Sequence, residues 1–202
     1  MRTRGFTLIE LMVVIAIIAV LTSIISVSIA SSKQKSRDSK RVADVKLIQL
    51  ALSQYYNDNG MYPLNIYAAS GAAPGGGLAP TYLPVVPIDP QGGTGSCSAA
   101  TANSSGTGCY RYTPYTTSSS GICSNSSSNL PIIYHIGAGF EDTSSSALSQ
   151  DIDGNSSLSN VYTSITFYRC TTSPSPASFD GNAGGCTGTS AATPDGCYDL
   201  TP

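Results

Sequence analysis

The sequence has no tryptophan and a single histidine, His135. It contains no Cys-x-x-Cys pair and no nucleophile motif with a histidine partner. Zinc sites and nucleophilic catalysis depend on clustered cysteine and histidine side chains, so these absences argue against a zinc site and against an enzyme. We expect His135 to be a core or sheet-face residue without a catalytic role.

Basic residues are scarce after Lys46, where Arg111 and Arg169 stand against nine acidic residues. Residues 47–202 therefore carry a net charge of −7, whereas the whole chain has a net charge of −2 and a pI of about 5.1. This balance argues against general nucleic-acid binding. The N-terminal quarter is instead apolar and then basic. The N-terminal quarter and the acidic remainder therefore suit two different environments.

The stretch from Leu11 to Ser32 has no charged residue, proline or glycine. As a helix its 22 residues would be about 33 Å long, enough to cross a bilayer. A secretory signal peptide would have a shorter apolar region followed by an Ala-x-Ala-like site, which residues 28–32 match only loosely. The pattern favours a membrane-spanning helix behind the short basic stretch Met1–Gly5.

Glu10 lies at the edge of this apolar run. A carboxylate carried to the centre of a bilayer costs roughly 2.5–3.5 kcal/mol. Two interpretations are open: the charge is tolerated at the level of the lipid headgroups, or it serves a partner that brings a counter-charge.

Residues 5–15 read Gly-Phe-Thr-Leu-Ile-Glu-Leu-Met-Val-Val-Ile. This segment resembles the cleavage motif of type IV prepilins and of the pseudopilins of type II secretion. The resemblance implies cleavage after Gly5 by prepilin peptidase, a membrane aspartyl protease, and N-methylation of Phe6. It also implies that Glu10 meets the Phe6 amine of a neighbouring subunit during assembly. Gly5 fits this role because it has no side chain to hinder a protease.

Arg2 and Arg4 would hold the leader at the anionic cytoplasmic face of the membrane. The run 33–46 carries more basic residues, so a positive-inside count alone would not favour this orientation. The cleavage motif and the position of the cysteines decide the orientation instead. Three roles stay open for the basic run: a solvated collar at the membrane surface, charge pairing between subunits, or nucleic-acid binding, which its lack of interleaved aromatics disfavours.

No proline or glycine occurs between Phe6 and Asn59, which predicts one helix from about Phe6 to Asn57 that ends before Gly60. Its second half has one apolar stripe, made of Val42, Val45, Ile48, Leu52 and Tyr55 with Ala51 and Tyr56 beside them. The stretch 44–63 also resembles the family, above all the major pseudopilin of type II secretion. The resemblance covers residues 1–63 and departs from many pilins in lacking a proline inside the apolar helix.

Residues 64–80 read as a loop, and three segments behind it are rich in β-branched and aromatic residues: Tyr110–Tyr115, Pro131–Gly137 and Val161–Arg169. They predict a small antiparallel sheet that faces the amphipathic half of the helix. The fold class is therefore α+β, with a leader at 1–5, a transmembrane and filament-core helix at 6–32, an amphipathic helix at 33–59 and a globular head at 60–202.

All six cysteines fall in the head: Cys97, Cys109, Cys123, Cys170, Cys186 and Cys197. An even count in Gly/Ser-rich surroundings predicts disulfides formed outside the cytoplasm. Six cysteines allow fifteen pairings, and the sequence does not choose among them.

The segment Asp151-Ile152-Asp153-Gly154-Asn155 alternates oxygen-bearing side chains around a glycine. Asp151, Asp153 and Asn155 are candidate Ca²⁺ ligands, although the twelfth position of a calcium loop is Tyr162 and not an acidic residue. The resemblance favours calcium, because related major pseudopilins bind it in a head loop. An acidic surface turn without a metal is the alternative, and we expect no other cofactor.

We expect a structural pilin of a type IV pilus-like filament, with a major pseudopilin of type II secretion as the alternative. A membrane-anchored extracellular binding module is the second alternative, and cleavage after Gly5 would distinguish it. The expected partners are other copies of the chain, prepilin peptidase, the pilus or secretion assembly machinery and, before assembly, membrane lipid. The precursor would cross the inner (cytoplasmic) membrane once, and the filament would be extracellular or periplasmic.

Overall fold

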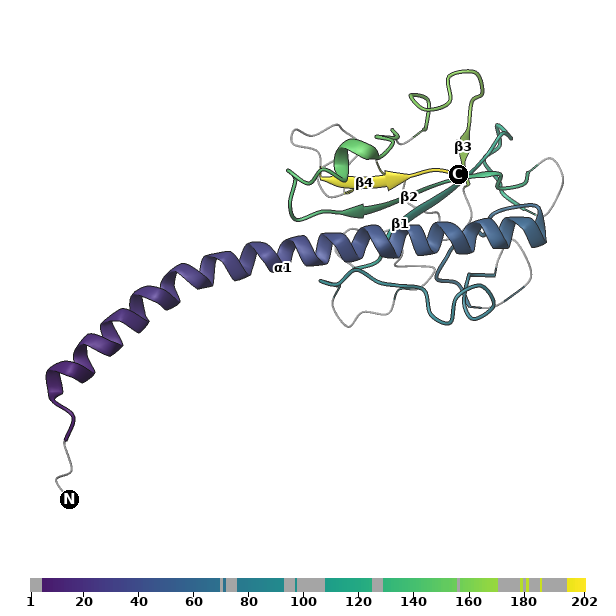
Figure 1. The fold of residues 1–202 in the computed structure, drawn as a ribbon. Coiled ribbons are helices and arrows are strands. Elements are labelled where there is room, and N and C mark those ends of the chain that lie inside the picture. Colours follow the sequence, from purple (N-terminus) through teal and green to yellow (C-terminus); the bar gives the residue numbers. More distant parts are fainter. Residues whose placement is uncertain are drawn as a thin grey trace. The chain divides into compact units, whose positions relative to one another are not determined.

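A computed structural model describes residues 5–69, 71, 76–92, 97, 108–124, 129–155, 157–170, 179, 181, 186 and 196–202, with the backbone alone for 24–28. The chain divides into two compact units, residues 1–36 and 37–202, which we describe separately. Helix α1 (Leu8–Asn59) contributes to both units, and the sheet belongs to the second (Figure 1).

Helix α1 forms as one helix, and each of its ends lies two residues after the expected position. At its end Gly60 takes the left-handed conformation (φ 69°), and its amide donates to the carbonyl of Tyr56. At its start Thr7 is the non-helical cap, and its carbonyl accepts the first intrahelical bond, from the Leu11 amide at 3.4 Å. The helix therefore begins two residues after the expected start at about Phe6.

The apolar stripe of the second half of α1 is the core of the head. Val45, Ile48 and Leu52 are completely buried, and Tyr55 is nearly so. They pack in one cluster with aromatic and aliphatic residues of the sheet, among them Tyr112 and Ile136. The expected single stripe is confirmed, because burying this face removes apolar surface from water.

The sheet has four strands in the order β3-β1-β2-β4, and every neighbouring pair is antiparallel. The bounds are β1 Arg111–Thr116, β2 Ile133–Gly139, β3 Tyr168–Arg169 and β4 Cys197–Leu200. Strands β1 and β2 form the centre, with Thr113 opposite His135. Figure 1 shows them beside the C-terminal half of α1.

Both faces of the central strands are covered, so β1 is buried throughout. Tyr112 and Tyr134 pack in the cluster with α1, whereas Tyr115 packs with Leu158 and Phe167 in a second cluster. Because strand side chains alternate between faces, this separation assigns the two clusters to opposite sides of the sheet.

Two of the three expected strands form with bounds shifted by one or two residues. The third, Val161–Arg169, shrinks to β3 because Tyr162 belongs to a turn, in which its amide donates to the Leu158 carbonyl at 2.9 Å. Strand β4 was not expected. It is four residues long and obtains its partners from β2, where Gly139 lies opposite Cys197.

The six cysteines form three disulfides, as expected: Cys97–Cys109, Cys123–Cys170 and Cys186–Cys197. The first lies before β1, the second joins the segment after β1 to the residue after β3, and the third ends in β4. Each typically contributes about 2–4 kcal/mol to the stability of a small domain. They therefore support a head whose sheet is short and whose loops are long.

Candidate functional site

The N-terminal motif has a defined local geometry. The Thr7 amide donates to Glu10 Oε2 at 2.9 Å, and the Glu10 amide donates to Thr7 Oγ1 at 3.3 Å. Thr7 Oγ1 also donates to Glu10 Oε2 at 2.7 Å. This reciprocal pair is a capping box, which satisfies amides that the first turn of a helix leaves without partners.

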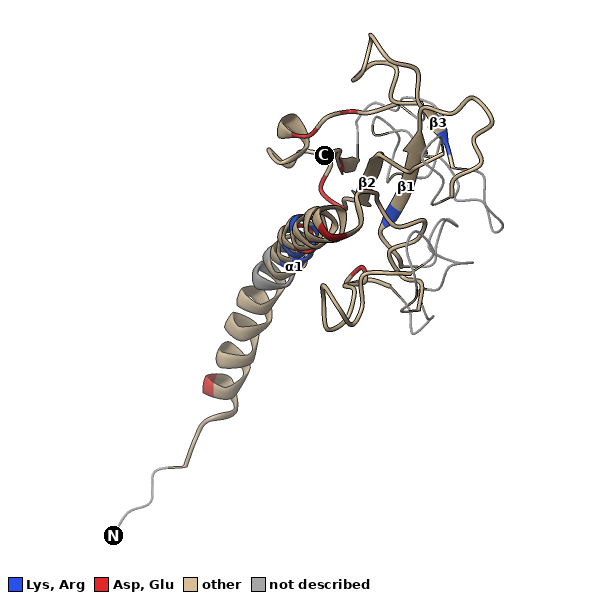
Figure 2. Cartoon of the chain, turned by 90° about the vertical axis from the view of Figure 1, so that its right-hand side faces the viewer, with Lys and Arg blue, Asp and Glu red and all other residues tan. Residues whose placement is uncertain are grey.

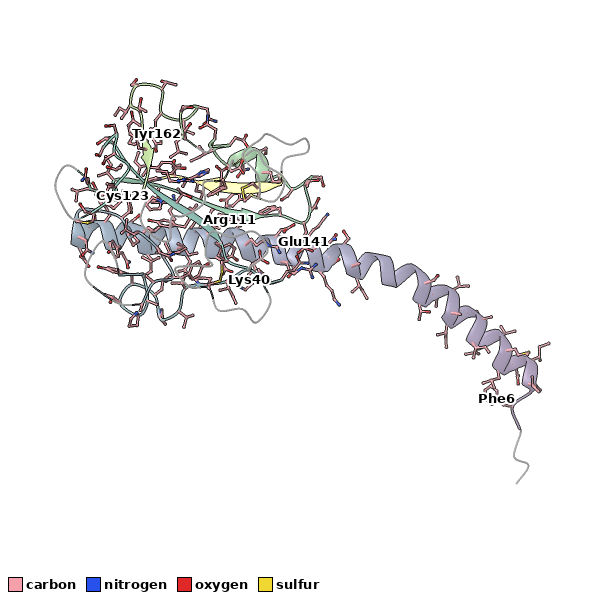
Figure 3. All side chains as sticks on the ribbon, turned by 180° about the vertical axis from the view of Figure 1, so that it is seen from behind. Phe6, Lys40, Arg111, Cys123, Glu141 and Tyr162 are labelled. Carbon is pink, nitrogen blue, oxygen red and sulfur yellow. A yellow bond between two sulfur atoms is a disulfide. The ribbon has the colours of Figure 1, made fainter. Side chains whose placement is uncertain are left out.

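Gly5 and Phe6 precede this cap and lie outside the helix. Phe6 exposes 84% of its surface, and Figure 3 shows its side chain at the start of α1. The bond expected to be cleaved is therefore accessible in the first unit. Glu10 is the acidic residue of the first turn of α1, and Figure 2 shows acidic colour near the start of this helix.

Apolar side chains of the first unit are exposed around the helix. Each exposes between 47% and 84% of its surface: Phe6, Leu8, Ile9, Leu11, Met12, Val13, Val14, Ile15, Ile17, Ile18, Val20, Leu21 and Ile29. Such a contiguous apolar surface marks an interaction site, because exposed patches of this extent are rare on soluble monomers. Within the described part of the chain, no helix combines the length and apolarity needed to span a membrane.

A cluster of charges joins the second half of α1 to the loops of the head; we call it the ion cluster, and it consists of Arg37, Asp38, Arg41, Asp89 and Glu141. Its centre is Arg41, whose side chain is 2% exposed. Arg41 contacts Asp38 at 2.6 Å, Asp89 at 2.6 Å and Glu141 at 2.9 Å. Burial by itself lowers the pKa of Arg41, but hydrogen bonds to the three carboxylates outweigh it, so the pKa is raised and the guanidinium stays charged.

Glu141 is the second junction of the ion cluster. Its oxygens accept from Arg37 Nε at 2.6 Å and from Arg37 Nη2 at 2.5 Å, a bidentate pair. The bond to Arg37, reinforced by Arg41, lowers the pKa of Glu141 to about 2. Asp38 accepts from the amides of Glu141 and Asp142, so side chains of the helix hold the backbone of this loop. Figure 3 shows Glu141 beside α1.

Some residues of the basic run 33–46 form ion pairs within the chain. Arg37 and Arg41 pair with acidic residues of their own head, and Lys40 pairs with Asp44 one turn along the helix at 2.6 Å. These residues are thus engaged within one chain. Figure 2 shows Lys and Arg gathered on this part of α1.

The head also brings three carboxylates together: Asp151, Asp153 and Asp199, which we call the acidic cluster. One oxygen from each lies within 4.8 Å of the others. Two of the three were expected from the sequence. Asp199 was missed, because it lies in β4, far along the chain, in a strand that carries no clear sequence signal.

Asp199 holds the 151–155 loop through hydrogen bonds to its backbone. Its Oδ1 accepts from the Asp153 amide at 3.0 Å, and its Oδ2 accepts from the Gly154 amide at 2.9 Å. Its own amide donates to Asp151 at 3.3 Å. Gly181 packs so closely that a Cβ there would lie 2.3 Å from Asp199 Oδ2. The carboxylate of Asp199 is therefore enclosed, and each of its oxygens accepts from a backbone amide of the 151–155 loop.

Asn155 has a different role in the structure. Its Oδ1 accepts from the amides of Ser157 and Ser159, at 3.3 and 2.9 Å, and so stabilises the turn that follows. The structure thus brings Asp151 and Asp153 together with Asp199, and it directs the side-chain oxygen of Asn155 to the next turn.

The donor set of the acidic cluster fits a calcium ion. Calcium binds carboxylate oxygens at about 2.3–2.6 Å, so two ligands on opposite sides of the ion are separated by about 4.8 Å. The observed spacing of the three oxygens stays within that limit. Asp151 and Asp153 are half-buried, with one oxygen of each shielded from solvent, and Asp199 is fully buried.

His135 is a buried core residue, as expected. Its Nε2 lies 2.5 Å from Asp199 Oδ2, and both side chains are inaccessible to solvent. Its ring stacks on Phe179 with centroids 4.0 Å apart. The bond connects β2 to β4 on the face of the sheet opposite α1, so it supports the strand that carries Asp199.

Comparison with known proteins decides the family. Residues 1–26 match the model of the prokaryotic N-terminal methylation motif. The chain is 34% identical over 99 residues to type II secretion system core protein G of Escherichia coli K12, across 45% of this chain and 68% of that protein. It is 36% identical to the protein of the same name from Klebsiella pneumoniae, across 45% of this chain and 71% of that protein.

The chain belongs to the pilin and pseudopilin family. The protein of the same name from Pectobacterium carotovorum is 44% identical over 62 residues, which are 31% of this chain and 40% of that protein. No solved structure matches the chain. Membership in the family agrees with the resemblance read from residues 1–63, and these relatives favour the secretion alternative over the surface pilus.

Proposed function

We propose that the chain is a structural subunit of a type II secretion filament, namely its major pseudopilin. The observation that supports this most directly is the identity to type II secretion system core protein G over about 99 residues. The N-terminal methylation motif supports the expected surface pilus only coarsely. The subunit acts by assembly and has no catalytic role of its own.

Processing after Gly5 creates the reactive end of the subunit. Hydrolysis adds the hydroxyl of water to the Gly5 carbonyl carbon and a proton to the Phe6 nitrogen, which leaves as an amine and becomes an ammonium. The N-terminal methylation motif implies that this amine is then methylated. An ammonium and a carboxylate are each costly in an apolar filament core and much less so as a pair. Glu10 would therefore set the register between subunits.

The exposed apolar side chains between Phe6 and Leu21 form the surface through which subunits would assemble. Before assembly the apolar run would store the precursor in the cytoplasmic membrane, and the filament would extend into the periplasm. Other copies of the same helix replace lipid around these side chains, and the gain comes from close packing and from the Glu10 pair. The assembly machinery of the secretion system would be the partner in this step.

The ion cluster would fix the head to the part of the helix that leaves the membrane. Arg41 is bonded to Asp89 and Glu141 of the head as well as to Asp38 of the helix. A force applied along the helix is then transmitted to the head through buried, multiply bonded groups. This connection suits a subunit that is pushed or pulled as part of a filament.

Calcium binding at the acidic cluster is part of the proposal. Asp151, Asp153 and Asp199 would hold the ion, and the fit of their oxygen spacing to calcium supports this assignment. The ion would neutralise three neighbouring carboxylates and fasten the 151–155 loop to β4. Its role would be structural, in the exposed head.

Two experiments test the proposed function. Mass spectrometry of subunits recovered from filaments should give an N-terminus at methylated Phe6, and an intact Met1 would refute processing. Deleting the gene in its own organism should abolish secretion of proteins into the medium and leave surface piliation intact. Loss of surface fibres with normal secretion would establish the pilus instead. Glu10→Ala should fail to restore secretion, whereas the wild-type gene restores it.

A further inference from the structure

The capping box places a boundary between the helix and the bond that is cleaved. Thr7 is the last residue outside α1, and it is held there by two bonds from its own backbone amide and hydroxyl to Glu10. A third bond, from the Glu10 amide to the Thr7 hydroxyl oxygen, closes the box. The Gly5–Phe6 bond therefore lies just outside the helix, with Phe6 between it and the cap.

A peptide bond inside a helix is a poor substrate for a protease. Its carbonyl and amide take part in the helical hydrogen-bond ladder, and the surrounding turns shield it from attack. Cleavage after Gly5 thus requires that the helix begin after Phe6. Cleavage should be fastest for a precursor in which the start of the helix is already fixed after Phe6.

Without the cap, the boundary would move towards the scissile bond. In apolar surroundings backbone groups must find partners within the chain, so an uncapped helix extends and does not fray. The next residue upstream that is tolerated as a cap is Gly5, and using it would make Phe6 helical. The next threonine downstream is Thr22, well inside the apolar run.

We infer that Thr7 is a positioning residue for processing: its capping box with Glu10 holds the Gly5–Phe6 bond outside the helix for prepilin peptidase. Thr7 acts through the backbone and does not touch the reacting atoms. The inference rests on the proposed cleavage after Gly5 and adds a second role for Glu10, within its own chain. Glu10 would first cap its helix in the precursor and later serve assembly.

The test uses the full-length precursor in detergent micelles with purified prepilin peptidase, and mass spectrometry follows the release of the leader. Thr7→Val keeps the shape of the side chain and removes the hydroxyl acceptor and donor. We expect kcat/KM to fall about fivefold, as loss of a typical helix cap implies. Thr22→Val is the matched control, because it makes the same change inside α1, and it should be cleaved at the wild-type rate.

Two further variants separate positioning from direct recognition of the hydroxyl. Thr7→Ser keeps the hydroxyl, and Thr7→Asn replaces it with another good capping group. Both should restore cleavage to within twofold of wild type. NMR chemical shifts of residues 5–10 report where the helix begins. They should show that Phe6 is helical in Thr7→Val and that the helix begins after Thr7 in the two capping variants.

The outcomes are distinct. If wild-type precursor is not cut after Gly5, the proposed function fails. If wild type is cut and Thr7→Val is cut equally fast, the positioning role of Thr7 is refuted and the proposed function stands. If Thr7→Asn restores the helix boundary and stays as slow as Thr7→Val, the protease reads the hydroxyl itself and the inference is also overturned.

Discussion

Arg41 and Asp89 form a bidentate pair across 48 residues of sequence. Arg41 Nε lies 2.6 Å from one carboxylate oxygen of Asp89, and Nη2 lies 2.8 Å from the other. A planar guanidinium matches a carboxylate in this geometry, which a lysine cannot reproduce. The pair connects α1 to the segment that leads into the sheet, and it adds a buried polar connection to the apolar packing between them.

Arg41→Met should therefore destabilise the head strongly. It leaves Asp38, Asp89 and Glu141 without their shared cation, and breaking a buried ion pair from one side costs about 3–5 kcal/mol. Urea denaturation of the folded subunit measures the loss. Lys40→Met removes the exposed partner of Asp44 and should change the free energy of unfolding by about 0.5 kcal/mol or less. Equal effects of the two variants would contradict a dominant role for Arg41.

The ion cluster also predicts how stability depends on pH. The folded-state pKa of Glu141 is lowered from 4.5 to about 2, so the folded state binds fewer protons than the unfolded state in this range. The stabilisation from Glu141 is complete above pH 4.5 and is lost as the pH falls towards 2. Denaturation at a series of pH values should show this decline.

Glu141→Gln isolates that contribution. The variant should be less stable than wild type near neutral pH and should lose less stability between pH 4.5 and pH 2, so the two curves approach each other in acid. Parallel curves across this window would show that Glu141 does not carry the pH dependence.

The elements that local chemistry determines could be predicted from the sequence. The end of α1 follows from Gly60, and its buried face follows from the spacing of Val45, Ile48 and Leu52. The start of α1 could also have been found, since Thr7-x-x-Glu10 is a capping-box signature. It was missed because Glu10 was interpreted as a charge at the membrane edge or as a partner between subunits, and not as part of a helix cap.

Other features depend on partners that are distant in sequence. Strand β4 forms because β2 offers it an edge, and its polar Asp199 gives no strand signal. Two of the three carboxylate partners of Arg41 lie 48 and 100 residues away, so part of a basic run that seemed to face the membrane surface or other subunits is engaged within its own head. The disulfide pairing likewise required the fold.

The three disulfides should differ in their contribution to stability. Cys123–Cys170 spans 47 residues, whereas Cys97–Cys109 spans 12. A cross-link that closes a longer loop removes more entropy from the unfolded chain, and the logarithmic dependence gives a difference of about 1 kcal/mol. Replacing both cysteines of each pair by alanine and measuring urea denaturation tests the order. A larger loss for the Cys97–Cys109 pair would contradict the entropic explanation.

Calcium should stabilise the head through the acidic cluster. Adding Ca²⁺ to the chelator-treated subunit should raise its melting temperature, because an ion that binds only the folded state stabilises it by mass action. Asp151→Asn and Asp153→Asn each remove a charged ligand and should abolish the rise. Asp58→Asn, an exposed acidic position on α1, is the matched control and should respond like wild type.

Asp199→Asn should behave differently from the other two ligand variants. Asp199 bonds to His135 and to the amides of Asp153 and Gly154, so its replacement should lower the melting temperature even in the presence of chelator. Asp151→Asn and Asp153→Asn should melt close to wild type without calcium and separate from it only when calcium is added. If all three variants responded to calcium as wild type does, the acidic cluster would not be the binding site, and the fastening of the 151–155 loop would depend on Asp199 alone.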